Sequence, residues 1–203
     1  QEVVLAPLRP EDIGQLVADS LHCELQPAEL LAHLIHEKTG GNPFFTIQFM
    51  TELEEEGFLR FDSRAATWQW DLERIHSKGY SANVVDLMVG KLVRFPQATQ
   101  DALKQLASLG NSAEFTLLRA MYEDSRMEEI HGQLWVAVWT GLVIRSENSY
   151  RFVHDRVQEA AYSLIPDEQR AQTHLRIGRI LMESTPPEQT AEAIFEIVNQ
   201  LNR

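Results

Sequence analysis

The sequence has almost no cysteine and no long apolar run, and each shortage excludes a class of protein. Cys23 is the only cysteine among 203 residues, so no intramolecular disulfide can form and a reducing compartment, the cytoplasm, is expected. No apolar run approaches the roughly 20 residues of a membrane span. The first residues also lack a basic stretch followed by a long apolar core, so they do not read as a signal peptide.

Basic residues are scarce relative to acidic ones. The chain has 18 Lys and Arg against 30 Asp and Glu, which gives a net charge of −12. Contacts to phosphates need clustered Lys and Arg, so this balance argues against direct binding of nucleic acid. It also argues against docking on an anionic membrane surface.

The motifs of common catalytic and phosphate-binding sites are missing as well. Gly90 and Lys91 form the only Gly-Lys pair, and Val85 stands where the first glycine of a P-loop is required. No GxGxxG, HExxH, CxxC or GxSxG pattern occurs. Cys23 and its neighbouring histidines lack the further ligands of a zinc site. We therefore expect no catalytic residue, no metal site and no cofactor in this chain by itself.

What the sequence does contain is apolar material with mainly helical spacing. Hydrophobic residues make up 44% of the chain, enough to bury a core. Pro10 and the pair Asn42-Pro43 are helix-start signals, and Gly57 is a stop signal. The spacing predicts helices over 10–21, 27–39, 43–56, 83–94, 96–109, 115–122, 128–140, 155–164 and 191–201, with a further helical stretch after Pro166.

Alternating residues predict β-structure in three places. Residues 58–61 and 67–70 form one hairpin, residues 142–145 and 150–153 form a second, and residues 3–8 form a short strand. Residues 72–82 have no clear period and contain Gly79, so a linker at a domain boundary is predicted there.

Single side chains are assigned by their place on these helices. Leu30 belongs to the predicted inward stripe of its helix, and Glu52 to the solvated face of the next one. Trp135 and Trp139 are predicted to lie in the core, with a docking surface for a neighbouring domain as the alternative.

These elements predict a mainly α fold with two small β-hairpins. Three helices followed by a hairpin, over residues 97–153, is the order of a winged helix. The chain is therefore divided into a helical domain with a hairpin at 1–80, a winged-helix domain at 81–165, and C-terminal helices at 166–203 that begin a helical repeat.

Two stretches carry a resemblance to a known family. TGGNPFF at residues 39–45, followed by LEEEG at 53–57, resembles the lid segment of the STAND class of P-loop signalling ATPases. FVHDRVQEAAYSLI at 152–165 and HLRIG at 174–178 are similar to the same class. The resemblance covers nearly the whole chain and includes ATPases embedded in large bacterial multi-domain sensor kinases and regulators. There an ATPase core leads into a helical lid, a winged helix and helical repeats, which implies that residues 1–80 are the lid.

The resemblance also implies a nucleotide contact. The Gly-x-Pro motif of the family's lid approaches the adenine of bound nucleotide, which here assigns Gly41, Asn42 and Pro43 to the adenine side. Glycine lets backbone approach a flat ring, and proline fixes the turn without a competing N–H. Asn42-Pro43 can equally be a helix start alone. The phosphate loop and the acidic magnesium partner are expected before Gln1, in a longer protein that binds ATP or ADP with magnesium.

The pair His154-Asp155 stands at the junction between wing and helix in this resemblance. An acid–base role for the pair is the less favoured interpretation. We expect Asp155 to cap the helix that follows and His154 to bond nearby backbone.

Three functions are compatible with the sequence. In the first, a non-catalytic lid and winged helix relay nucleotide state by rigid-body motion about residues 72–82. Its partners are the ATPase core, helical repeats and output domains of one longer protein, such as one with protein kinase or sensor histidine kinase domains. The second is a helical scaffold or protein-interaction module without a nucleotide link. The third is a winged-helix transcription regulator. The helix over 128–140, which would have to enter the major groove, has no Lys or Arg, and this argues against direct DNA binding.

Overall fold

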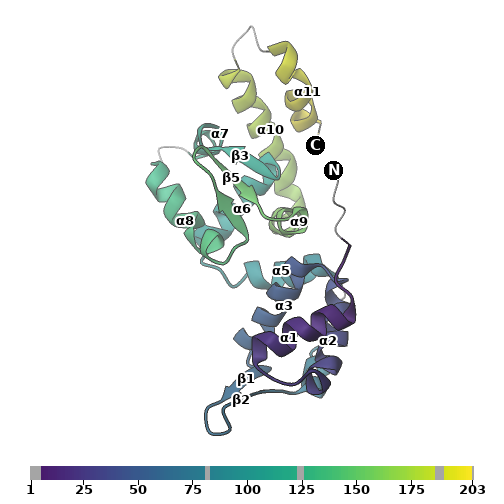
Figure 1. Cartoon of the computed structure of the whole chain (residues 1–203). Helices are drawn as coiled ribbons and strands as arrows, with labels where there is room; N and C mark the ends of the chain where they lie inside the picture. Colours follow the sequence, from purple (N-terminus) through teal and green to yellow (C-terminus); the bar gives the residue numbers. More distant parts are fainter. Residues whose placement is uncertain (1–5, 81–82, 123–125, 186–189, 203) are drawn as a thin grey trace. The chain divides into compact units, whose positions relative to one another are not determined.

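The computed structural model describes residues 6–80, 83–122, 126–185 and 190–202. The chain divides into two compact units, which we call unit 1 (Gln1–Leu87) and unit 2 (Met88–Arg203). The described residues are mainly helical with two small antiparallel sheets, which confirms the predicted fold class at this level (Figure 1). The division into three domains at 80 and 165 stays a prediction.

Unit 1 is built from helices that bury their apolar stripes against one another. Helix α1 packs against α2, and α3 packs against both α2 and β1. Strands β1 and β2 form the first predicted hairpin, with Phe61 opposite Trp68. The elements are α1 (Pro10–Leu21), α2 (Leu25–Thr39), α3 (Pro43–Glu55), β1 (Leu59–Asp62), β2 (Thr67–Trp70), α4 (Leu72–Ser77) and the first residues of α5 (Val84–Leu92). Its core includes Ile13, Val17, Leu31, Ile35, Phe49 and Leu53, all fully buried.

Two side chains of unit 1 face the opposite way from the prediction. Leu30 is 66% exposed, because it lies about 200° around α2 from the buried Ala28. Glu52 is only 3% exposed. It comes three residues after Phe49 and seven after Phe45, so helical spacing places it on their buried face.

The linker predicted over residues 72–82 is wrong for its first half. Residues 72–77 form helix α4, whose N-cap Asp71 accepts a hydrogen bond from the amide of Arg74 at 3.0 Å. Ile75, 1% exposed, anchors this helix in the core of unit 1. A helix of six residues is too short to show a period in the sequence. Residues 81–82 lie outside the described residues, as do residues 3–5 of the strand predicted over 3–8. Residues 6–8 of that strand have no regular structure.

Unit 2 combines a helical core with a three-stranded sheet. The sheet order is β3-β5-β4, and both neighbouring pairs are antiparallel, with Ala113 opposite Tyr150 and Ile144 opposite Arg151. The second hairpin is confirmed, whereas β3 was not predicted. The elements are the remainder of α5, then α6 (Gln97–Leu109), β3 (Ser112–Glu114), α7 (Phe115–Ala120), α8 (Met127–Trp139), β4 (Val143–Arg145), β5 (Ser149–Phe152), α9 (Asp155–Ser163), α10 (Asp167–Ser184) and α11 (Thr190–Leu201).

The last two helices pack against each other at the end of unit 2 (Figure 1). A polar chain runs through this packing. The Tyr162 hydroxyl lies 2.7 Å from Nε2 of His174, and Nδ1 of His174 lies 2.6 Å from Oε1 of Gln200. His174 is fully buried, so these two contacts join α9, α10 and α11 through one imidazole. Among the described residues, no helix has the length and apolarity needed to cross a bilayer.

Candidate functional site

The turn between α2 and α3, residues 39–45, holds the predicted nucleotide residues; we call it the glycine turn. Gly40 ends α2 in the left-handed conformation, with φ of 60°, and its N–H donates to the carbonyl of His36 at 2.8 Å. Gly41 follows with φ of 74°. Two successive residues in this region reverse the chain into α3, which explains why glycine stands at both positions.

Gly41 makes its close approach to the chain's own backbone. The amide of Leu8 donates to the carbonyl of Gly41 at 2.8 Å. A Cβ at Gly41 would overlap the carbonyl oxygen of Leu8 and lie 3.1 Å from its nitrogen. Gly41 is also buried. The segment over residues 6–9 therefore requires glycine here, whether or not a ligand binds.

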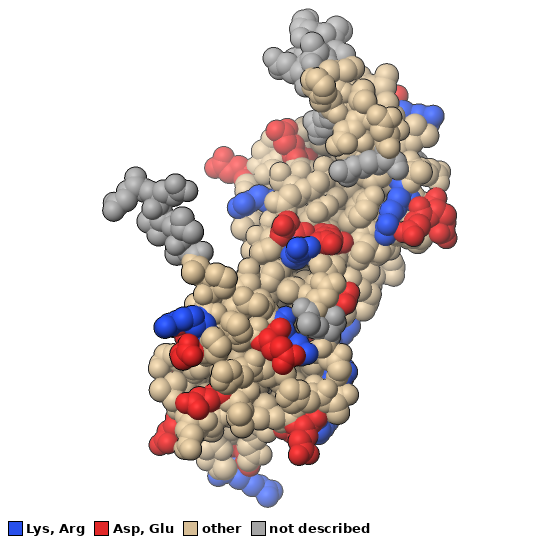
Figure 2. All heavy atoms as spheres, turned by 90° about the vertical axis from the view of Figure 1, so that its right-hand side faces the viewer, with Lys and Arg blue, Asp and Glu red and all other residues tan. Residues whose placement is uncertain are grey.

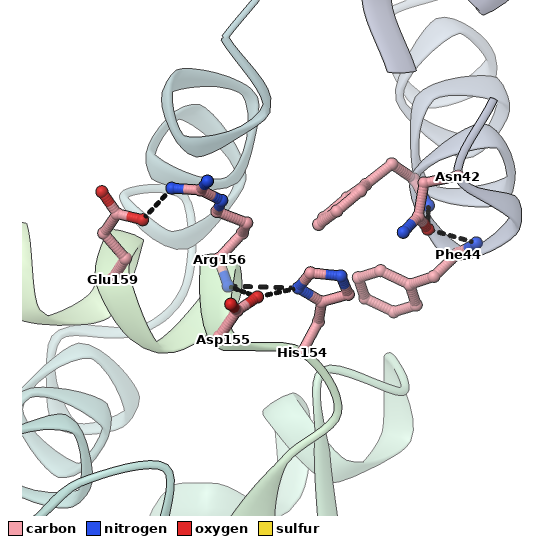
Figure 3. A network of polar contacts seen from close by, with 7 residues as sticks. Asn42, Phe44, His154, Asp155, Arg156 and Glu159 are labelled. Carbon is pink, nitrogen blue, oxygen red and sulfur yellow. Dashed lines mark hydrogen bonds and ion pairs between the residues drawn. The ribbon is translucent and has the colours of Figure 1, made fainter. Parts of the chain in front are cut away.

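Asn42 caps α3, as the sequence predicted. Its side-chain oxygen accepts from the amide of Phe44 at 3.0 Å (Figure 3) and from that of Phe45 at 3.3 Å. The amide of Thr46 donates to the carbonyl of Asn42 at 2.9 Å, and Pro43 has no N–H to satisfy. The first-turn amides of α3 are thus all engaged, so this helix start does not present donors to a phosphate group.

The three residues predicted to contact nucleotide differ in how exposed they are. Gly41 is buried, Asn42 is half-buried and Pro43 is exposed. The helix start is confirmed, and the contact with adenine stays a prediction. Of the three, the ring of Pro43 is the one that presents the most surface to a ligand.

The junction before α9 is a helix cap, and Nδ1 of His154 also contacts Oδ1 of Asp155 within it. The amide of Arg156 donates to Nδ1 of His154 at 3.2 Å and to Oδ1 of Asp155 at 2.8 Å (Figure 3). The N-cap is His154, one position before the predicted cap Asp155, and the helix begins at Asp155 as predicted. Arg156 also pairs with Glu159 at 2.7 Å on the exposed side. These contacts stabilise the start of α9.

The tryptophans of α8 are not core residues. Trp135 is 57% and Trp139 is 79% exposed, so their predicted burial is wrong. The buried face of α8 is formed by Ile130, Leu134 and Ala137. Trp135 lies 100° around the helix from Leu134, and Trp139 lies opposite Ala137, which turns both rings away from the core.

A polar cluster that the sequence did not suggest joins α8 to the sheet. Nδ1 of His131 lies 2.6 Å from the Tyr150 hydroxyl, and Nε2 lies 3.2 Å from Nη2 of Arg145. Arginine only donates, so Nε2 accepts and the proton stands on Nδ1, pointing to Tyr150. Burial lowers the pKa of His131, and the nearby Arg145 cation lowers it further. Arg145 lies fourteen and Tyr150 nineteen residues after His131 in the sequence, so no local pattern reveals these contacts.

In the described part of the chain, no three side chains among His, Cys, Asp and Glu are grouped closely enough to hold an ion. The thiol of Cys23 is half-buried, and burial raises its pKa, which makes it less reactive.

Comparison with known proteins places the chain beside a signalling protein. No family model matches the sequence. The chain is similar to hybrid signal transduction histidine kinase G of Dictyostelium discoideum, with 26% identity over 218 aligned positions. The alignment covers 89% of this chain but only 6% of that kinase. The chain therefore aligns with a small region of a much longer signalling protein.

Proposed function

We propose that the chain is the lid and winged-helix region of a signal-transducing STAND ATPase, which relays nucleotide state to neighbouring sensor or output domains. One observation carries the signalling role: the similarity to a signal transduction histidine kinase runs through 89% of the chain and takes up 6% of the kinase. A region of that size is a module that works with the domains around it.

The order of elements in unit 2 supports the winged-helix part of the proposal. Helices α6, α7 and α8 are followed by the β4–β5 hairpin, and β3 between α6 and α7 completes the sheet by pairing with β5. This is the winged-helix order inferred from the sequence, with one additional short strand. The capped junction at His154 then leads into α9 and the C-terminal helices.

The glycine turn fits a contact with the base of a nucleotide and not with its phosphates. Pro43 offers an exposed, rigid ring at the start of α3, and Asn42 lies half-buried beside it. Phosphate and magnesium would have to be held by a core outside this sequence, which lacks a P-loop. We accordingly propose that the chain alone does not hydrolyse ATP, and that ATP or ADP with magnesium binds the longer protein.

The partners in this proposal belong to the same polypeptide. They are the ATPase core, helical repeats continuing from α10 and α11, and an output domain. A cytoplasmic location is proposed because Cys23 is the only cysteine, which suits a reducing compartment.

Replacing Pro43 by alanine tests the relay. In the isolated chain the change should cost only about 0.4–1 kcal/mol of unfolding free energy, since proline at the first helical position loses no hydrogen bond. In the longer protein, losing a rigid wall beside adenine should weaken ADP binding roughly tenfold, which equals about 1.4 kcal/mol. Calorimetric titration with ADP and the melting temperature of the isolated chain supply the two measurements.

Pro27→Ala is the matched control, because Pro27 is also an exposed proline in the first turn of a helix. It should leave ADP affinity unchanged. If Pro43→Ala leaves it unchanged too, the glycine turn is a helix start and nothing more. If the isolated chain unfolds on Pro43→Ala, the residue is structural rather than sensory.

The scaffold alternative rests on the same C-terminal helices and requires no nucleotide. It would be favoured if a longer protein that includes the upstream sequence bound no ADP at all.

The winged-helix order makes a DNA test necessary, and we expect no binding. Helix α8 would have to enter the major groove, yet it contains no Lys or Arg and carries Glu128 and Glu129 in its first turn. On the face drawn in Figure 2, Lys and Arg side chains lie singly or beside acids and form no continuous basic stripe. A gel shift with duplex DNA at ~150 mM salt should show no complex at low micromolar protein, a range in which even some non-specific binders, with Kd of about 10⁻⁴–10⁻⁶ M, are detected. A retarded band would contradict this expectation.

A further inference from the structure

Helix α8 carries two large rings that its own unit does not cover. The ring centroids of Trp135 and Trp139 lie 6.3 Å apart, and the rings are 57% and 79% exposed. Among the described elements of unit 2, α8 lies at the outer side, with α6 and β4 against its other face (Figure 1). Exposed tryptophan pairs are informative because this residue is the most enriched at binding hot spots.

The rings belong to a continuous line of exposed residues, which we call the tryptophan stripe. Glu128, Gly132, Trp135 and Trp139 follow at spacings of four, three and four, so they lie within about 60° of one another around the helix. Each of the four is exposed. A Cβ on Gly132 would meet nothing within 4 Å, so this position adds no side chain between Glu128 and Trp135.

Charge indicates what kind of partner binds this stripe. Glu128 is acidic, and α8 contains no Lys or Arg that would oppose a cation. Arg126, the N-cap, lies about 160° around the helix from Glu128. Arg145 is directed at His131 and the Phe115 ring. The whole chain carries a net charge of −12, so a cationic partner is also attracted at longer range.

We propose that the tryptophan stripe binds an arginine-bearing amphipathic helix of another protein. Its arginine would lie over Gly132, paired with Glu128 and stacked on Trp135. Guanidinium suits both contacts, because it binds carboxylates through a planar fork and stacks on indole rings. Apolar residues of the same helix would cover Trp139. The proposal does not depend on nucleotide binding by the longer protein.

A second copy of the chain fits less well. Two copies would bring Glu128 into an interface between chains that each carry a net charge of −12.

The test uses the whole chain and two synthetic helical peptides of about 15 residues. One has leucines on one face with arginine beside them, and the other replaces each arginine by glutamate. Calorimetric titration should give a Kd of roughly 10–100 μM for the arginine peptide, and at least tenfold weaker binding for the glutamate peptide.

Variants of the stripe locate the binding site. Trp135→Ala and Trp139→Ala should each weaken binding of the arginine peptide about tenfold, and Glu128→Gln about threefold. Gly132→Ala should also weaken it by about tenfold, although alanine favours the helix and keeps the chain folded. Glu129→Gln is the matched control, since Glu129 lies 100° from Glu128, and it should change nothing.

Four results would overturn the proposal. Neither peptide binds at up to ~1 mM, both peptides bind equally, or the stripe variants bind as tightly as the unchanged chain. Sedimentation that shows a dimer, lost on Trp139→Ala, would overturn it in favour of a second copy.

Discussion

Alanine at position 41 should destabilise unit 1 by about 2–4 kcal/mol, whereas alanine at position 40 should cost about 1–2 kcal/mol. Both glycines have positive φ, of 74° at Gly41 and 60° at Gly40, and an L-residue in that region loses about 1–2 kcal/mol. Only Gly41 adds a steric cost. A Cβ there overlaps the carbonyl of Leu8, while a Cβ on Gly40 meets nothing within 4 Å.

The additional cost comes from a backbone contact that cannot relax cheaply. Leu8 is fixed against Gly41 by the hydrogen bond from its amide, at 2.8 Å. To admit a methyl group, the segment over 6–9 must move and that bond must stretch or break. Insertion of a methyl group into a filled space typically costs 1–3 kcal/mol.

Hydrogen exchange gives the cleanest measurement, because two compact units need not unfold together. Amides of α1 and α3 should lose protection on Gly41→Ala by the expected free energy, with a smaller loss on Gly40→Ala. Amides of α6 in unit 2 are the internal reference. Equal losses for the two variants would show that packing against Leu8 does not decide the identity of residue 41.

This pair of variants bears on how the glycine turn is tested for function. If Gly41→Ala perturbs unit 1, any loss of nucleotide binding on that change has a structural cause. The exposed Pro43 lacks this ambiguity, since its substitution leaves the backbone contacts of the turn in place. The nucleotide role should therefore be judged on Pro43.

Sequence patterns located the longer helices well because each of these carries its own signal. Pro10, Asn42 and Gly57 mark helix ends by local chemistry, and the structure places helix or turn boundaries at or beside each of them. The Asn42 cap, including both amide contacts, follows from one residue type at one position.

The predictions that failed did so for a different physical reason. Trp135 and Trp139 are apolar residues at helical spacing, and composition alone suggested burial. Their angular position, in line with Glu128 and Gly132, is the signal that would have indicated an exposed face. Strand β3 escaped notice because it has three residues, and it exists through pairing with β5 far along the chain.

Side-chain clusters assembled from distant segments lie outside what one sequence reveals. His131 meets Arg145 and Tyr150 only because the sheet packs beside α8. His174 likewise meets residues twelve and twenty-six positions away. Such contacts depend on tertiary structure, and local propensity does not predict them.

Replacing His174 by alanine should destabilise the C-terminal helices by about 2–4 kcal/mol. The side chain is fully buried, so the change removes packing and leaves a cavity. It also removes both hydrogen-bond partners at once. Gln200, 6% exposed, then keeps an amide oxygen without its donor, and the Tyr162 hydroxyl loses its partner on the imidazole.

The position of the His174 ring explains why this network is sensitive to replacement. Its Nδ1 donates to the Gln200 oxygen, which can only accept, while Nε2 lies within hydrogen-bond distance of the Tyr162 hydroxyl. One ring therefore makes polar contacts on opposite sides. Gly178 lies one turn further along α10 with the side chain of Leu201 directly over it, so α11 sits close and leaves little room for rearrangement.

Hydrogen exchange on α10 and α11 measures this effect, and Gln172→Ala, an exposed position on the same helix, is the matched control. The control should change protection by less than about 0.5 kcal/mol. In a double-mutant cycle, His174→Phe with Gln200→Leu should cost less than the sum of the two single changes, because apolar replacement of both partners leaves no unpaired amide between α10 and α11. Additive costs would mean that the two side chains contribute separately, and that packing alone joins α11 to α10.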